Sequence, residues 1–354
     1  MPNQSEDILD LEDIPSENQD LDLDNASYKI NTYGADFTVE ILSGKLIDKE
    51  IVVPSFQRRY VWPHKKASKL IESFLLGLPV PQIFLYRKEK TQDLIVVDGQ
   101  QRLRTINYYL RETFEDGSPF RLESVKQQWE GKLYSDLTEQ DKRKFKNSVL
   151  RTTIFEQTDP KDESSVFEIF ERLNTGGMAL TLQEIRNCVV NGNINSFLEK
   201  INGHSSWRSL LGKSQPDSRM KDIEMILRFF ALRSGWKTYK KPMKDFVSSF
   251  MKEKKDINEE EMKEFDSIFK FTTDSILSRL GSGAFRLKSG INVALLDALM
   301  VSLAGVDLSK ISNIDEKYNK LISNESFKEA VSQHTTDVDR VQSRIKIANE
   351  IFSE

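Results

Sequence analysis

The segment LIVVDGQQRLRTINYYL, at residues 94–110, constrains the fold more than any other part of the chain. It begins with four apolar residues typical of a buried strand, and apolar residues then recur at helical spacing from Leu103 to Leu110. Only Asp98 and Gly99 separate the two patterns, so a strand must turn directly into a helix. Such a turn requires a glycine and a capping residue. It does not require the two glutamines and the arginine that follow.

The elements around this turn predict a small α/β module. One helix is bounded by Pro63, which favours a helix start, and by Gly77, which favours a helix end. From about residue 120 the apolar pattern is mostly helical, so the expected fold class is α+β, a small module followed by a helical extension and a helical domain. The expected elements are a strand from residue 51, a helix between 63 and 77, strands over 82–87 and 93–97, a helix over 99–112 and a later strand over 150–155.

The first 28 residues differ from the rest in charge. They contain nine Asp and Glu and no Lys or Arg, a composition that predicts a disordered acidic tail. Residues 29–192 would form one domain, made of the α/β module and its helical extension, and residues 193–354 a helical domain. The C-terminal helices carry no readable motif, so packing, homo-oligomerisation and docking of a partner are all open roles for them. Arg340 and Arg344 are expected on a solvated helical face.

Composition excludes several classes of protein. The single cysteine, Cys188, cannot support a disulfide framework, which favours a cytoplasmic location. The N-terminus is acidic and lacks the basic and apolar regions of a signal peptide. No apolar run approaches the roughly 20 residues of a membrane span, so we expect no membrane association.

The region around the strand–turn–helix segment is basic. Residues 51–110 carry ten Lys and Arg against four Asp and Glu. A positive surface of this kind attracts anionic ligands such as nucleotides or nucleic acid. A solvated surface without a ligand would give the same count, so charge alone leaves both interpretations open.

Ordinary helix capping explains part of the turn. Asp98 is a favourable N-cap residue, Gln101 stands three residues later in the spacing of a capping box, and Gly99 permits the tight turn. Capping does not explain Arg102 or the basic residues nearby.

Anion binding explains the remaining residues. The first turn of a helix presents unpaired N–H groups and the positive end of the helix dipole. Arg102 can grip a phosphate with both arms of its guanidinium, while Gln100 and Gln101 can donate to oxygens or orient a water molecule. Asp98 can lie beside a phosphate only if a cation separates them. Mg²⁺ would therefore make Asp98 a metal ligand, or a base that positions the attacking water.

The segment QRRYVW carries a second polar cluster just after the first predicted strand. Gln57 and Arg58, with the next arginine, could contact phosphates, and Tyr60 could stack on a base. The alternative is that the aromatic residues pack in the core while the arginines are solvated. We expect that alternative for Trp62 and the ligand role for Gln57 and Arg58.

The segment FERLNTGGMALTLQEIRN combines helix punctuation with a third polar cluster. Thr181 and Glu184 have the spacing of a capping box, and the glycine pair can end the preceding helix. The polar groups that crowd around this turn could form a second wall of the ligand site. The residues of this second wall are Asn174, Gly176, Gly177, Glu184, Arg186 and Asn187.

Taken together, these segments resemble the N-terminal domain of GmrSD-type modification-dependent restriction enzymes, a bacterial family marked by a DGQQR box. The resemblance runs in order from about Tyr28 to Asn191. The matching residues are Pro54, Gln57, Arg58, Tyr60 and Trp62; Gly77, Pro79 and Pro81; Asp98, Gly99, Gln100, Gln101, Arg102, Leu103 and Thr105; and Leu173, Asn174, Thr175, Gly176, Gly177, Leu182, Glu184, Arg186 and Asn187.

The resemblance implies a ParB/sulfiredoxin-like fold for the first module and NTP binding and hydrolysis, with Mg²⁺, at the DGQQR box. It also implies a role in restriction and phage defence, with DNA as a partner. Carried over to this sequence, the catalytic and phosphate-binding core is Asp98, Gln100, Gln101 and Arg102. The residues implied to bind nucleotide or phosphate are Gln57, Arg58, Tyr60, Gly99 and Arg104.

One departure from the family concerns DNA cleavage. Full-length relatives often add a C-terminal nuclease domain of His-Asn-His type, which needs a general-base histidine close to metal-binding residues. Here His204 and His334 stand alone in the sequence, so we do not expect that nuclease chemistry. DNA cleavage would then fall to a separate nuclease or another subunit of the defence system.

Three functions are compatible with these residues. The first is an NTPase whose hydrolysis is coupled to DNA recognition, which the complete DGQQR box favours. The second is a non-hydrolytic sensor of DNA or nucleotide that recruits a nuclease, since binding and hydrolysis need nearly the same residues. The third is a direct DNase. The lack of an obvious second metal-binding acid near Asp98 counts against it.

Overall fold

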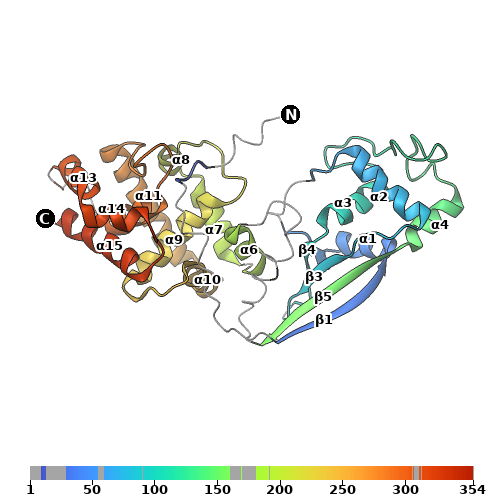
Figure 1. Ribbon diagram of the computed structural model, residues 1–354, viewed down its shortest axis with the longest axis horizontal. Coiled ribbons are helices and arrows are strands. Elements are labelled where there is room, and N and C mark those ends of the chain that lie inside the picture. The colour runs from blue at the N-terminus through green and yellow to red at the C-terminus, as the bar shows by residue number, and fades with distance from the viewer. Residues whose placement is uncertain are drawn as a thin grey trace. The chain divides into compact units, whose positions relative to one another are not determined.

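The computed structural model divides the chain into two compact units (Figure 1). The sheet unit comprises residues 27–180, and the helical unit comprises residues 1–26 together with residues 181–354. The helical unit is therefore built from both ends of the chain, and the sheet unit is inserted between them in the sequence. The structure describes residues 9–12, 29–54, 60–89, 91–159, 181–190, 192–304 and 313–353, with Ile169, Val306 and Ile311.

The sheet unit contains a five-stranded mixed sheet with the order β1-β5-β3-β4-β2. β2 runs parallel to β4 and β3 parallel to β5, whereas β3 is antiparallel to β4 and β1 to β5. Because β2 and β4 are parallel, their carboxyl ends meet at one edge of the sheet. The strands are β1 (Lys29–Thr38), β2 (Ile51–Val52), β3 (Ile83–Arg87), β4 (Leu94–Asp98) and β5 (Val149–Asp159).

Four helices share one hydrophobic core with this sheet (Figure 1). α1 packs against α3 and α4, and α2 also packs against α3 and α4. α2 follows Pro63 and ends at Gly77, whose φ of 78° lies in the left-handed region that favours glycine. The helices are α1 (Val39–Ile47), α2 (His64–Leu76), α3 (Gln100–Leu110) and α4 (Glu139–Asn147). The strands predicted over 82–87 and 93–97 and the two predicted helices correspond to β3, β4, α2 and α3.

The helical unit packs around two strongly buried helices, α9 and α12. Seven of the ten residues of α12 are buried, and α12 contacts both α9 and α15. Together with the sheet unit, this confirms the predicted α+β class. The helices are α6 (Leu182–Val189), α7 (Asn193–Asn202), α8 (Ser205–Leu211), α9 (Lys221–Gly235), η2 (Trp236–Thr238), α10 (Met243–Glu253), α11 (Glu259–Leu280), α12 (Val293–Ser302), α13 (Ile314–Ser323), α14 (Glu325–Ser332) and α15 (Val338–Ser353). Among the described residues, no helix combines the length and apolar character needed to cross a membrane.

A buried carboxylate connects three helices of this unit. Asp297 of α12 accepts hydrogen bonds from Arg228 of α9 and from Arg344 of α15, each at 2.8 Å. The side chains of Asp297 and Arg344 are fully buried. The expectation of a solvated face is therefore wrong for Arg344, whereas Arg340 is partly exposed and pairs with Glu329. Arg344 is buried because Asp297 and the carbonyl oxygen of a neighbouring turn compensate its charge.

Four residues of the predicted acidic tail also belong to the helical unit. Leu9 is 4% exposed, and Leu11 forms a parallel β-bridge with Ile291. The sequence predicts disorder over residues 1–28, whereas the described residues 9–12 pack against the unit. The rest of that range lies outside the described residues.

Replacing Asp297 by alanine would leave two buried guanidinium groups without their shared carboxylate. We expect the free energy of unfolding to fall by about 3–5 kcal/mol, because an uncompensated charge remains in the core. Urea denaturation measures the change. The matched control is Glu264→Ala, at an exposed position of α11, for which we expect a change within about 0.5 kcal/mol. Equal values for the two variants would contradict the role given to the network.

Candidate functional site

The DGQQR box forms a sharp strand-to-helix turn at the sheet edge where β2 and β4 end. β4 ends at Asp98, and Gly99 is the N-cap residue of α3 with a φ of 100°. A Cβ atom at this position would lie 2.3 Å from Cγ2 of Ile83 on β3. Glycine is thus required both for the left-handed backbone and for the close approach of β3. Asp98 does not cap α3, and no side chain caps this N-terminus among the described residues.

Asp98 is instead paired with Arg102. Nη2 of Arg102 donates to Oδ2 of Asp98 at 2.6 Å, one helical turn away. The arginine side chain is 15% exposed and the aspartate side chain 42% exposed. Nε of Arg102 is buried and has no hydrogen-bond partner among the described residues. The guanidinium is therefore held beside the start of α3 with donor capacity left over.

The loop before α2 is fastened to the same helix. The backbone N–H of Val61 donates to Oε1 of Gln101 at 3.1 Å, and the hydroxyl groups of Tyr60 and Thr105 are 2.8 Å apart. Tyr60 also packs edge-on against Tyr108, with 5.0 Å between ring centroids. Burial raises the pKa of Tyr60 to about 12. Tyr60 therefore remains a neutral wall residue at ordinary pH, and Gln101 is engaged in holding the loop.

An open groove of about 390 Å³ runs beside α3. Arg104, Asn107 and Tyr108 line it from the helix, and Lys49 lines it from the loop before β2. Arg104 also contacts Glu115 at 3.3 Å. The rest of the lining is apolar and comprises Leu46, Ile51, Val52 and Val53. The groove therefore combines two cations, an amide and a phenol with an apolar wall.

Gln100 lies one turn before Arg104 and on the same helical face. Its Oε1 is buried without a hydrogen-bond partner among the described residues. An unpaired buried amide oxygen carries a free-energy cost, and such groups often mark a site for a water molecule, an ion or a ligand. The structure thus places Asp98, Gly99, Gln100, Gln101 and Arg102 together at the start of α3, with Arg104 in the adjacent groove.

Some predicted residues lie outside the described residues. They are Gln57 and Arg58 of the second cluster, and Asn174, Gly176 and Gly177 of the second wall. Pro54, which precedes the second cluster, follows β2 at the same sheet edge as the DGQQR turn. Tyr60, which belongs to this cluster, is bonded to Thr105 of α3. Pro54 and Tyr60 are the described residues on either side of residues 55–59.

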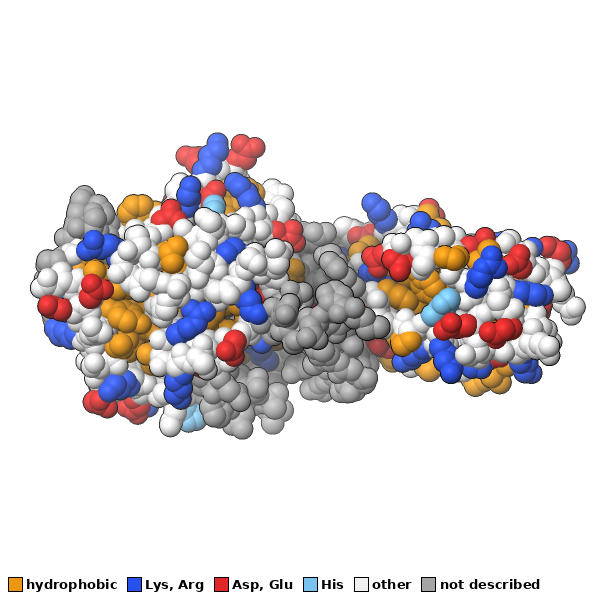
Figure 2. Space-filling model, turned by 90° about the horizontal axis from the view of Figure 1, so that it is seen from above, with side chains coloured by type: hydrophobic (Ala, Val, Ile, Leu, Met, Phe, Trp, Pro, Cys, Tyr) orange, Lys and Arg blue, Asp and Glu red, His pale blue; other side chains and the backbone are white. Residues whose placement is uncertain are grey.

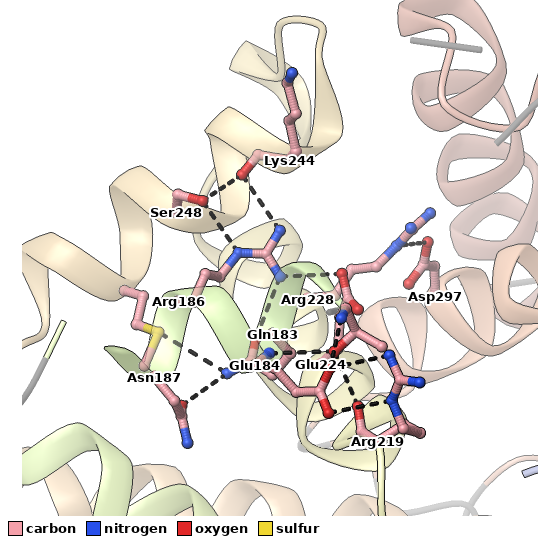
Figure 3. A network of polar contacts seen from close by, with 12 residues as sticks. Gln183, Glu184, Arg186, Asn187, Arg219, Glu224, Arg228, Lys244, Ser248 and Asp297 are labelled. Carbon is pink, nitrogen blue, oxygen red and sulfur yellow. Dashed lines mark hydrogen bonds and ion pairs between the residues drawn. The ribbon is translucent and has the colours of Figure 1, made fainter. Parts of the chain in front are cut away.

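Glu184 of the proposed second wall lies in the helical unit. Thr181 and Glu184 form the predicted capping box at the start of α6, with both reciprocal hydrogen bonds present. Arg219 donates to both carboxylate oxygens of Glu184, at 3.1 Å each (Figure 3). Burial raises the pKa of the Glu184 carboxyl, against the opposing effect of the Thr181 N–H and Arg219.

Arg186 and Asn187 are also bonded within the helical unit. Arg186 is 1% exposed and joins α6 to α9 and α10 (Figure 3). Oδ1 of Asn187 accepts from Nε2 of Gln183 at 3.2 Å. These bonds fasten α6 inside its unit, and the second wall stays a prediction. The partners of Arg186 are Gln183, Glu224, Ser248 and the carbonyl oxygen of Lys244.

The described residues on the face drawn in Figure 2 form no large surface of one charge that would attract an anionic ligand. Basic and acidic side chains are interspersed over both units there. Within the described ranges, no group of three or more His, Cys, Asp or Glu is placed to hold a metal ion. Asp98 is one exposed carboxylate, and Mg²⁺ is commonly held by one or two carboxylates together with substrate phosphates. One carboxylate is therefore not enough to hold Mg²⁺ here, and the remaining ligands would have to come from a bound molecule.

The glycine turn, the paired aspartate and arginine and the mixed sheet define a DGQQR-box α/β domain. Residues 39–191 match the family model described as the N-terminal domain of the GmrSD restriction endonuclease. This part of the chain is a GmrSD-type N-terminal domain, which suggests a component of a restriction or phage-defence system. No nuclease-domain family matches the C-terminal part of the chain. No curated protein matches the chain significantly.

The close approach of Gly99 to Ile83 can be tested by substitution. We expect Gly99→Ala to lower the free energy of unfolding by about 2–4 kcal/mol, since it adds overpacking to the strain of a positive φ. The control is Gly117→Ala, which has a φ of 81° but no atom within 4 Å of the added Cβ. For this variant the free energy of unfolding should fall only by the cost of a positive φ, about 1–2 kcal/mol. Equal losses in urea denaturation would show that the contact with β3 does not matter.

Proposed function

We propose that the sheet unit binds a nucleoside triphosphate at the DGQQR turn and hydrolyses it with Mg²⁺, and that hydrolysis is coupled to recognition of DNA. The observation that carries this proposal is the start of α3. Among the described residues, a helix N-terminus without a side-chain cap, a largely buried arginine with an unused Nε–H donor and a groove with two cations meet on one helix.

The phosphates would bind at the first turn of α3. Backbone N–H groups and the helix dipole favour an anion at this position. Gly99 permits the left-handed turn that starts α3 directly after β4. Arg102 lies beside the turn and can form charge-assisted hydrogen bonds with phosphate oxygens. The buried Oε1 of Gln100 can accept a hydrogen bond from a water molecule at the same place.

Asp98 and Arg102 would exchange partners when the nucleotide binds. In the structure Nη2 of Arg102 donates a hydrogen bond to Oδ2 of Asp98 at 2.6 Å. A phosphate competes with Asp98 for the guanidinium and so releases the carboxylate. The released Asp98 can hold Mg²⁺ or orient the attacking water. Mg²⁺, when bound, would neutralise phosphate charge and polarise the phosphoryl group.

The groove beside α3 suits the nucleoside part of the ligand. Its volume of about 390 Å³ lies in the range of small-molecule sites, roughly 300–1,000 Å³. The apolar wall can cover a base or sugar, Asn107 and Tyr108 can form polar contacts with it, and Lys49 and Arg104 add positive charge. A separate nuclease would then cut DNA after a nucleotide-dependent change in this protein.

A non-hydrolytic sensor is the second candidate. It is favoured by the presence of a single carboxylate at the turn, since many hydrolytic metal sites use two metal-binding acids. The two candidates share binding and differ in hydrolysis, so one set of variants separates them.

Removal of Arg102 should abolish hydrolysis. We expect phosphate release from the preferred ribonucleoside triphosphate to fall about 100-fold or more in Arg102→Ala, as for loss of a donor to developing charge. The control is Arg111→Ala, at the exposed C-terminal end of α3, which should keep wild-type release. Unchanged release in the folded Arg102 variant would refute the assignment of this residue.

Asp98→Asn separates binding from hydrolysis. We expect this variant to bind nucleotide with or without Mg²⁺ but to release no phosphate, because the neutral amide is a poor metal ligand and cannot act as a base. Chelation of Mg²⁺ should have the same effect on wild type, and DNA should raise the wild-type rate. Release is measured with each of the four ribonucleoside triphosphates. Nucleotide binding without release in wild type, under all conditions, would favour the sensor.

A further inference from the structure

Residues 9–12 lie on the helical unit and are joined to it by an isolated β-bridge. The N–H of Ile291 donates to the carbonyl oxygen of Asp10 at 2.9 Å, and the N–H of Glu12 donates to the carbonyl oxygen of Ile291 at 3.0 Å. These bonds form the parallel bridge between Leu11 and Ile291. Main-chain pairing of this kind is how many proteins bind extended peptides.

Side chains anchor both ends of the segment. Leu9 is 4% exposed, and its N–H donates to Oδ2 of Asp217 at 2.6 Å. At the other end, Oε1 of Glu12 accepts from the N–H of Lys288 at 2.9 Å, and Oε2 accepts from Nδ2 of Asn292 at 2.8 Å. Both oxygens of this carboxylate are therefore used.

The position of Glu12 is favourable for a negative charge. Asn292 caps α12, since its Oδ1 accepts from the N–H of Leu295 at 2.8 Å. The positive end of the α12 dipole thus lies beside the Glu12 carboxylate.

Between the anchors, the side chain of Asp10 is exposed and that of Leu11 is half-buried. We therefore expect the groove to select a peptide by the residues at the positions of Leu9 and Glu12, which are an apolar side chain and a glutamate.

The receiving groove is held in place by bonds that do not involve the segment. Oδ1 of Asp217 accepts from the N–H groups of Arg219 and Lys221, at 2.8 and 3.2 Å. The N–H of Asp217 donates to the buried Asp222 at 2.8 Å. These contacts leave Oδ2 of Asp217 directed to the segment. The side chain of Asp217 is thus held in position by hydrogen bonds that do not depend on the tail.

Gly290 makes room for the segment. A Cβ atom here would lie 2.8 Å from the nitrogen of Glu12 and 2.9 Å from the carbonyl carbon of Leu11. Gly290 is not among the glycines with a positive φ, so its backbone suits alanine. Its lack of a side chain matters for the approach of the peptide and not for the turn itself.

We propose that the groove formed by Asp217 and residues 288–292 is a binding site for peptides with an apolar residue three positions before a glutamate, and that Leu9–Glu12 occupies it in cis. The occupant is this chain's own N-terminus. A tethered ligand acts at an effective concentration of the order of millimolar. The tail therefore keeps the site filled against weaker peptides in solution.

The full chain carrying Leu9→Asp and Glu12→Lys tests the proposal, because both anchors are lost and the groove is freed. A fluorescein-labelled peptide of residues 5–16 is titrated and its anisotropy recorded. We expect saturable binding, at least about tenfold tighter than to wild type, where the tail competes. The same peptide with Gln in place of Glu12 should bind about tenfold more weakly, since a charge-assisted pair of hydrogen bonds is lost.

Gly290→Ala supplies the decisive control. Added to the anchor variant, it should abolish peptide binding while leaving the thermal transition unchanged. In the otherwise unchanged chain, it should also remove the slow amide exchange expected at Leu9 and Glu12, a readout that needs no peptide. The proposal is overturned if the peptide does not bind the anchor variant, if Gly290→Ala leaves binding intact, or if the two amides exchange equally fast in both proteins.

Discussion

The contact between Gly99 and Ile83 is the constraint on which the sheet unit depends. β4 stops beside β3 and reverses at once into α3 because residue 99 has no side chain, since a Cβ atom there would lie only 2.3 Å from Cγ2 of Ile83. That reversal places the start of α3 at the sheet edge where β2 also ends. The features of the candidate site depend on this placement. They include the pairing of Asp98 with Arg102 and the groove farther along α3.

The fold could be predicted where apolar periodicity is strong. The elements around the DGQQR box lie close to the predicted positions, because their buried faces leave a clear pattern. β1 was not predicted, because most of its side chains are exposed and it is fixed by pairing with the distant β5. α4 was missed for a related reason, since Phe145 is its buried residue. Elements that depend on a remote partner leave little trace in a local pattern.

The site was predicted less completely, because residue type does not reveal the partner of a charge. Arg102 lies where the motif suggested, but Asp98 bonds to it and does not cap the helix. Lys49 was not foreseen, since the loop that brings it to the groove carries no motif. Arg186 was assigned to the second wall of the site and Arg344 to a solvated face, yet both are buried and bond to acceptors from other helices. Such compensation depends on tertiary contacts and cannot be read from spacing.

The joining of the two chain ends in one unit has a consequence for synthesis. Domains generally fold in the order in which they leave the ribosome. Leu9–Glu12 leave the ribosome before the sheet unit, but Ile291, which pairs with Leu11, is made nearly three hundred residues later. The sheet unit, inserted between, is therefore complete while the helical unit still lacks α12 and α15. The N-terminal segment can therefore close onto its groove only after Ile291 has been made.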